Sequence, residues 1–133
     1  MITNTMSYAE RMKEFLENTS DSYAIFQLKR AEELDDLRFM RYSHLEEKRI
    51  EASINHYEIV YHGCLKKIKT TMEQLEDLFV KFNVDHPSDF RGHSMSVSDI
   101  VALKISGEVS FYYVDTFGFK CLPNFMQKAG VDN

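Results

Sequence analysis

The stretch IVALKISGEVSFYYVD, residues 100–115, consists of two apolar runs separated by a short polar interval. Branched and aromatic side chains favour extended backbone, so residues 100–104 and 109–115 are predicted to be strands. Residues 105–108 supply the turn between them, and Gly107 can take the positive φ that tight hairpin turns require. The sequence therefore predicts a β-hairpin, and antiparallel pairing is the starting point for the fold.

Two more strands are predicted upstream of this hairpin. Residues 23–28, YAIFQL, are rich in aromatic and branched side chains and read as a buried strand. Residues 56–62 alternate with a period of two, which places Tyr57, Ile59 and Tyr61 on one face of a strand that ends at Gly63.

Helical patterns lie between and before the strands. Residues 71–82 have an apolar stripe made of Met72, Leu75, Leu78, Phe79 and Phe82. Residues 7–18 predict an amphipathic helix, with Ser7 as N-cap and Glu10 completing a capping box. Ser43 and Glu46 form a second capping box, which predicts a short helix to about Arg49. Residues 31–42 fit either a helical turn or a strand.

Strands and helices alternate without a βαβ order, which predicts an α+β fold with a small, mostly antiparallel sheet and two to four packed helices. A length of 133 residues suits one domain. We expect residues 1–20 to form an N-terminal helix and linker, residues 21–127 the α+β domain, and residues 128–133 a C-terminal tail.

Composition limits the classes of partner. The formal net charge of −5 disfavours duplex DNA, because such proteins carry a concentrated basic face, and the one dense basic cluster here is Lys66, Lys67 and Lys69. The two cysteines make no disulfide framework, and neither a signal peptide nor a long apolar run is visible. We expect a cytoplasmic protein without membrane association; its oligomeric state is left open.

The residues with the most chemistry lie between the predicted helix and the hairpin, in the stretch FNVDHPSDFRGHSMSVSDIV, residues 82–101. Asp85, His86, Asp89 and His93 are residue types that bind zinc, manganese or iron. Their spacing matches no standard metal motif. The alternative interpretation is structural, with Asp85 at the end of the helix and Asp89 bonding to backbone amides.

Nucleophilic catalysis has weaker support. Ser94, Ser96 and Ser98 lie near His93 and Asp99, yet sequence neighbours rarely converge as a triad, and no Gly-x-Ser-x-Gly or phosphate-binding glycine loop occurs. Serines placed before a strand more plausibly satisfy backbone groups. An enzyme is therefore not favoured, and no cofactor is predicted.

The signature in residues 82–101, together with YVDTFGF at 113–119 and LPNF at 122–125, resembles the YodL-like domain. The similarity extends upstream through YAIFQL at 23–28, LRF at 37–39 and YEIVY at 57–61. Such domains occur in large polyvalent proteins of conjugative elements, plasmids and phages. The resemblance implies a role in a mobile genetic element, in host-defence evasion or element maintenance, and it brings no catalytic residue.

Three hypotheses follow. The leading one is an accessory module that binds a protein partner through a patch of Asp89, Phe90, Arg91, His93 and Met95. The first alternative is a small metal-dependent enzyme that uses Asp85, His86, Asp89 and His93. The second alternative is single-stranded nucleic-acid binding by stacking on the aromatic residues of the hairpin and the following loop, namely Phe111, Tyr112, Tyr113, Phe117 and Phe119.

Overall fold

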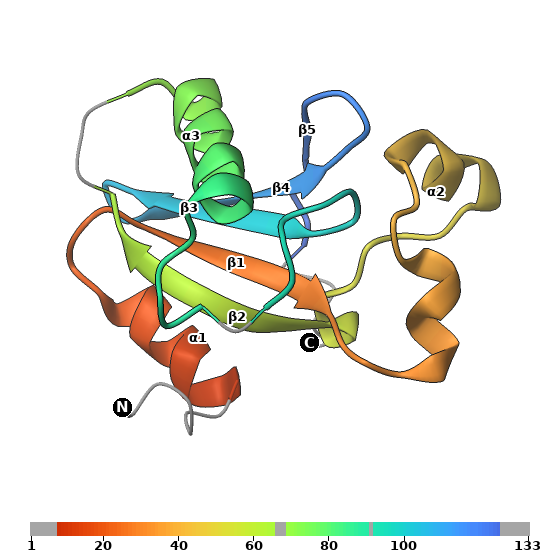
Figure 1. The fold of residues 1–133 in the computed structure, drawn as a ribbon, viewed down its shortest axis with the longest axis horizontal. Helices are drawn as coiled ribbons and strands as arrows, with labels where there is room; N and C mark the ends of the chain where they lie inside the picture. Colours follow the sequence, from red (N-terminus) through yellow and green to blue (C-terminus); the bar gives the residue numbers. More distant parts are fainter. Residues whose placement is uncertain (1–7, 66–68, 91, 126–133) are drawn as a thin grey trace.

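The computed structural model describes residues 8–65, 69–90 and 92–125, and Figure 1 shows their arrangement. Within these residues the chain forms one five-stranded antiparallel sheet in the order β2-β1-β3-β4-β5. Its strands are β1 (Ser22–Leu28), β2 (Tyr57–Cys64), β3 (Ile100–Ile105), β4 (Glu108–Val114) and β5 (Phe119–Cys121). The predicted α+β class and the antiparallel sheet are confirmed.

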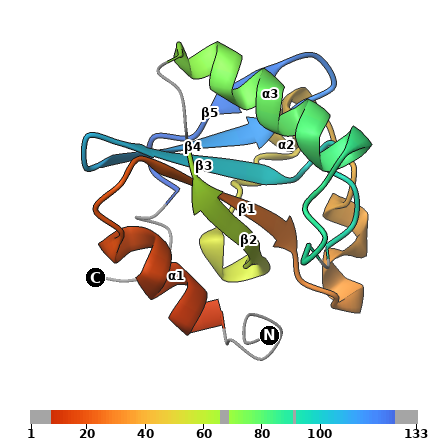
Figure 2. The ribbon, with the colours of Figure 1, turned by 60° about the vertical axis from the view of Figure 1, so that its left-hand side comes forward.

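The helices of the described residues lie on both faces of this sheet (Figure 2). α1 (Tyr8–Glu17) covers one face and α3 (Thr71–Val84) covers the other. The connection from β1 to β2 contains the 3₁₀ helix η2 (Glu32–Leu37), α2 (Tyr42–Lys48) and the 3₁₀ helix η3 (Ile54–His56). In the described part of the chain, no helix is long and apolar enough to cross a membrane.

The predicted hairpin is present as β3 and β4. Ile105 pairs with Glu108, so the turn consists of Ser106 and Gly107, with φ values of 53° and 84°. Two consecutive positive φ values match the right-handed twist of the flanking strands. The turn chemistry thus fixes the register of the two central strands.

α3 begins with a capping box that was not part of the sequence prediction. Thr70 Oγ1 accepts from the Glu73 amide at 3.2 Å, and Glu73 Oε1 accepts from the Thr70 amide at 3.0 Å. The predicted apolar stripe is half right: Leu75, Leu78 and Phe82 are buried, whereas Met72 and Phe79 stay exposed.

Each face of the sheet has its own apolar core. The face under α1 and α2 buries Phe15, Phe26, Leu45, Phe111, Tyr113 and Phe125 among others. The face under α3 buries Tyr23, Ile25, Leu75, Phe82, Phe90 and Val101 among others. Full burial of such a side chain stabilises the fold by roughly 1.5–3 kcal/mol, so the two faces hold α1 and α3 independently.

A β-bulge in β2 corrects the predicted strand pattern. Ile25 pairs with Tyr61 and Phe26 pairs with Ile59, which leaves Val60 as the extra residue. The bulge reverses the alternation, so Tyr57 and Ile59 join the α1 face while Tyr61 packs on the α3 face. The Arg11 guanidinium donates to the carbonyls of Ile59 and Val60, both at 3.2 Å, and thus covers the bulge.

The first turn of α2 is not capped as the sequence predicts. α2 begins after Arg41, whose side chain makes no cap, and Ser43 Oγ accepts from Arg41 Nε instead of capping the helix. The predicted capping box at Ser43 and Glu46 is therefore wrong. The predicted N-cap of the first helix, Ser7, lies outside the described residues.

Lys104 fastens α1 to the sheet. It lies on β3 and is only 8% exposed. Its ammonium group donates to the carbonyls of Phe15, Leu16 and Asn18 at the end of α1. These last carbonyls have no partner within the helix, and a cation at this terminus also interacts favourably with the helix dipole.

Candidate functional site

The four candidate metal ligands are directed to different partners. Asp89 accepts from the Tyr61 hydroxyl at 2.9 Å, and the His86 ring packs near Phe90 with Nδ1 2.9 Å from the Pro87 carbonyl. His93 faces Asp99, and Asp85 ends α3 through its amide. Among the described residues, no group of three or more His, Cys, Asp or Glu side chains is placed to hold a metal ion.

The predicted interaction patch also needs correction. Phe90 and Met95 are 5% and 3% exposed and belong to the core beneath α3. The Phe90 ring packs edge-on against Phe82, with ring centroids 4.9 Å apart. Asp89 and His93 remain accessible, while Arg91 lies outside the described residues. The two apolar side chains of the predicted patch, Phe90 and Met95, therefore point into the core and are not available to a partner.

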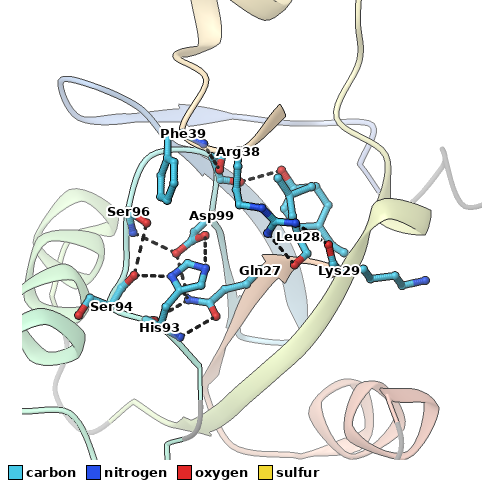
Figure 3. A network of polar contacts seen from close by, with 11 residues as sticks. Gln27, Leu28, Lys29, Arg38, Phe39, His93, Ser94, Ser96 and Asp99 are labelled. Atoms are coloured by element: carbon cyan, nitrogen blue, oxygen red, sulfur yellow. Dashed lines mark hydrogen bonds and ion pairs between the residues drawn. The ribbon is translucent and has the colours of Figure 1, made fainter. Parts of the chain in front are cut away.

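The structure instead centres the loop on Gln27, a buried residue near the end of β1 (Figure 3). Its Oε1 accepts from the His93 amide at 3.2 Å, and its Nε2 donates to the His93 carbonyl at 2.8 Å. The same Nε2 lies 3.1 Å from Asp99 Oδ2. One buried amide thus pairs with the loop backbone as a neighbouring strand would, and it also reaches the carboxyl group where β3 begins.

Gly92 allows this close approach. A Cβ atom at this position would lie 2.5 Å from Gln27 Oε1 and 2.9 Å from Phe90 Cζ. Neither atom is the free end of a flexible side chain, because Gln27 is hydrogen-bonded and Phe90 is buried. Glycine is therefore required here by contact with its neighbours rather than by backbone angle.

Asp99 is the titratable group at the centre of this network. The residue is 2% exposed, and burial raises the pKa of its carboxyl group to about 8, against the hydrogen bonds from Ser96 and Gln27, which lower it. Oδ2 accepts from the Ser96 amide at 3.0 Å. The buried carboxyl group thus keeps its proton to a higher pH than an exposed aspartate does.

His93 lies beside this carboxyl group with both ring nitrogens near protein oxygen atoms. Nδ1 is 2.7 Å from the Ser94 carbonyl, which accepts, and 3.2 Å from Gln27 Nε2, which donates, so it lies between an acceptor and a donor. Nε2 is 3.9 Å from Asp99 Oδ1, which is too long for a hydrogen bond. The Nε2 side of the ring therefore faces the Asp99 carboxyl group without a direct hydrogen bond to it.

The backbone is strained on the other side of Asp99. Phe39 and Ser98 both have positive φ, 65° and 87°, and the Phe39 amide donates to Ser98 Oγ at 3.0 Å. Ser98 is buried, and its carbonyl accepts from the Tyr57 hydroxyl at 2.7 Å. For a bulky residue such as Phe39, the left-handed region costs roughly 1–2 kcal/mol. The surrounding hydrogen bonds hold this conformation, and the Phe39 side chain stays exposed.

Arg38, next to Phe39, is held in place by the backbone. Its guanidinium donates to the Leu28 carbonyl at 3.3 Å and to the Lys29 carbonyl at 2.8 Å. It also forms an ion pair with Asp35 at 3.3 Å. These contacts fix one arginine at the point where β1 ends, beside the Gln27 network (Figure 3).

These elements enclose a cleft of about 540 Å³, which we call the Arg38 cleft. Its volume falls within the range of ordinary ligand sites. Residues from α1, β1, η2, β2 and the loop line it, namely Arg11, Gln27, Leu28, Arg30, Ala31, Glu32, Asp35, Arg38, Glu58, Val60, Gly92 and His93. The pKa of Glu58 is raised by burial at this site. The lining therefore includes three arginines and three acidic residues.

Sequence reasoning missed three residues of this site. The sequence places Gln27 only in a buried strand, and Arg38 and Phe39 lie in the segment 31–42, which fits either a helical turn or a strand. A signal was available for Gln27, because a glutamine inside a run of buried apolar residues needs hydrogen-bond partners. Nothing local marks Phe39 as left-handed, since its conformation depends on Ser98, 59 residues away.

The fold and site define a small α+β domain in which an antiparallel sheet carries buried Gln27 and Asp99, with His93 beside them, next to an arginine-lined cleft. Residues 22–125 match the YodL-like domain, and the chain belongs to this family. The match begins with the first residue of β1 and ends where the residues after β5 enter the core, so α1 lies outside it. The curated proteins and the solved structures compared with the chain gave no match.

Proposed function

We propose that this domain is a binding module of a mobile genetic element, and that it recognises a protein partner through Phe39 and the adjoining Arg38 cleft. The observation that carries the proposal is the state of Phe39. Its side chain is 63% exposed although its backbone is strained, and a buried network maintains both conditions. Strained backbone that the surroundings hold in place is typical of functional positions.

The residues beside Phe39 fit a protein interface. Hot spots in such interfaces are enriched in aromatic residues and arginine. Arg38 is already ordered by the carbonyls of Leu28 and Lys29, so it loses little conformational freedom on binding. Arg30 is an exposed member of the same cleft. An exposed aromatic side chain that adjoins Arg38, at a cleft that also contains Arg30, can therefore receive an apolar anchor with an acidic or polar neighbour.

The same geometry gives less support to the alternatives. Both nitrogens of the His93 ring face protein oxygens, and the nearest carboxyl group, Asp99, is buried, which is a poor arrangement for proton transfer to a ligand. For nucleic-acid stacking, two of the proposed aromatic residues, Phe111 and Tyr113, lie in the core. Protein binding remains the function that the exposed groups favour.

The proposal can be tested by site-specific photocrosslinking in the cells that naturally express the protein. Phe39 is replaced by p-benzoylphenylalanine, and Val84, which is 79% exposed at the end of α3, is replaced in a matched control. We expect one discrete protein adduct from position 39, none of the same mass from position 84, and loss of the adduct on adding Arg30→Glu. The same adducts from both positions, or an adduct that survives Arg30→Glu, would contradict the proposal.

A further inference from the structure

A second surface lies between α3 and the loop that joins β4 to β5, on the upper side of the sheet in Figure 1. It is a groove of about 430 Å³, which we call the Phe79 groove. The residues that line it come from α3, from this loop and from the adjoining ends of β4 and β5, namely Glu76, Phe79, Val80, Val114, Asp115, Thr116, Gly118 and Phe119.

The walls of the Phe79 groove are apolar and ordered. The Phe79 and Phe119 rings meet edge to face with centroids 6.4 Å apart, which joins the helix to β5. Val80 is 56% exposed on the helix side, and Phe79 beside it is 37% exposed. Exposed apolar side chains gathered at one place are typical of an interaction site.

The loop side of the Phe79 groove offers side chains rather than open backbone. Gly118 has φ of 77°, and the Asp115 amide donates to the Gly118 carbonyl at 3.0 Å, which closes the loop on itself. The added strand of a β-augmentation complex needs unpaired backbone groups along a sheet edge. A groove walled by a helix and a closed loop is better suited to a helix, whose apolar side chains enter at intervals of three and four residues.

The charge of the residues that line the Phe79 groove indicates which charged residues the docked helix carries on its polar face. Among the described residues that line the Phe79 groove, Glu76 and Asp115 are acidic and none is Lys or Arg. Asp115 is fixed, because its Oδ1 accepts from the amides of Tyr42 at 2.9 Å and Thr116 at 2.8 Å. A basic residue next to an apolar anchor would thus meet a carboxylate that is already in place.

We propose that the Phe79 groove docks a short amphipathic helix of a partner protein, with apolar side chains against Phe79, Val80 and Phe119 and basic side chains beside Glu76 and Asp115. A second copy of this chain is a poorer occupant. The chain has a net charge of −5, and the exposed apolar residues of α3 are accompanied by Glu73 and Glu76, so self-association brings like charges together. The Phe79 groove lies outside the Arg38 cleft and shares no lining residue with it.

Fluorescence anisotropy with the full chain tests this inference. The probe is a labelled synthetic amphipathic helix with leucine on one face and lysine on the other, and its counterpart carries glutamate in place of lysine. We expect the lysine peptide to bind in a salt-dependent way and the glutamate peptide to bind at least tenfold more weakly. Val80→Lys should weaken binding of the lysine peptide at least tenfold, and Glu76→Lys should weaken it several-fold and reduce the salt dependence.

Two matched variants separate this site from general attraction to an acidic protein. Val84→Lys changes an exposed apolar residue of the same helix outside the groove, and Glu33→Lys makes the same charge change as Glu76→Lys on η2. Both should bind the lysine peptide within twofold of the original chain. Equal losses in all four variants, or no loss with Val80→Lys, would overturn the inference. So would a dimer in sedimentation equilibrium that Val80→Lys dissociates, because it would assign the groove to self-association.

Discussion

The β3–β4 hairpin and the loop of residues 85–99 are neighbours in the chain but are specified in different ways. In the hairpin, each strand is apolar and the turn residues Ser106 and Gly107 take the positive φ values that a two-residue turn requires. In the loop, the decisive contacts come from β1, where Gln27 pairs with His93 across 66 residues of sequence. Local chemistry thus determines the hairpin, and long-range hydrogen bonds determine the loop.

The difference matters because the loop lies beside the Arg38 cleft. A buried polar network is favourable only when every member has its partner, so it specifies one arrangement and is sensitive to change. The hairpin has more tolerance, because its stability is distributed over apolar contacts and ladder hydrogen bonds. Substitutions that are chemically similar should therefore have larger effects around Gln27 than around the hairpin turn.

The largest expected effect is the pH dependence caused by Asp99. Burial raises the pKa of its carboxyl group from 3.8 to about 8, so the folded protein binds this proton more tightly than the unfolded chain does. The contribution of Asp99 to stability is therefore most favourable below pH 4 and declines as pH rises toward 8. The expected decline is roughly 1.4 kcal/mol per pH unit, or on the order of 4 kcal/mol between pH 4.5 and pH 7.5.

Urea unfolding of the original chain and of Asp99→Asn across this range measures that term. The asparagine is uncharged, and its oxygen can still accept from Ser96 and Gln27, as Asp99 Oδ2 does. The difference in free energy of unfolding between the two proteins should shift in favour of Asp99→Asn as pH rises. A constant difference from pH 4.5 to pH 8 would show that Asp99 is ionised in the folded state at no cost.

The same difference between local and long-range interactions determines which parts of the structure can be predicted from the sequence. The strands at 23–28, 100–104 and 109–115 and the helix at 71–82 can be predicted because apolar periodicity and turn residues act locally. The alternation in β2 failed beyond Ile59, because the bulge at Val60 depends on pairing with β1. The predicted interaction patch includes Phe90 and Met95, and both are instead buried in the core beneath α3, a long-range contact that the local sequence does not reveal.

Alanine substitutions at Gly92 in the loop and Gly107 in the hairpin turn test this difference. Gly92→Ala would place a methyl group 2.5 Å from Gln27 Oε1, and relief requires moving a buried, hydrogen-bonded side chain. Overpacking of this kind costs about 1–3 kcal/mol, and we expect a value near the upper end. Gly107→Ala meets nothing within 4 Å and costs only the strain of a φ of 84°, about 1 kcal/mol.

Urea unfolding measures the loss of stability in each variant, and NMR spectra of the histidine rings show whether the structure around His93 has changed. Gly92→Ala should shift the His93 signals, because Gln27 holds the His93 backbone, whereas Gly107→Ala should leave them unchanged. Equal destabilisation, or an unperturbed His93 in Gly92→Ala, would mean that Gln27 has room to adjust and that the network is less constrained than its contacts indicate.

The smallest expected effect on stability comes from relieving the left-handed backbone at Ser106, in the hairpin turn, and at Phe39, beside the Arg38 cleft. Ser106 and Phe39 both have left-handed backbone, with φ of 53° and 65°. Glycine removes this strain but adds freedom to the unfolded chain, so Ser106→Gly and Phe39→Gly should each change the free energy of unfolding by less than about 1 kcal/mol. Thermal unfolding measures both, and the photocrosslinking adduct formed from a probe at Glu32, an exposed residue of the Arg38 cleft, measures partner binding. We expect Ser106→Gly to keep that adduct and Phe39→Gly to lose it at nearly unchanged stability. Retention of the adduct in Phe39→Gly would leave the strained aromatic residue without a role in recognition.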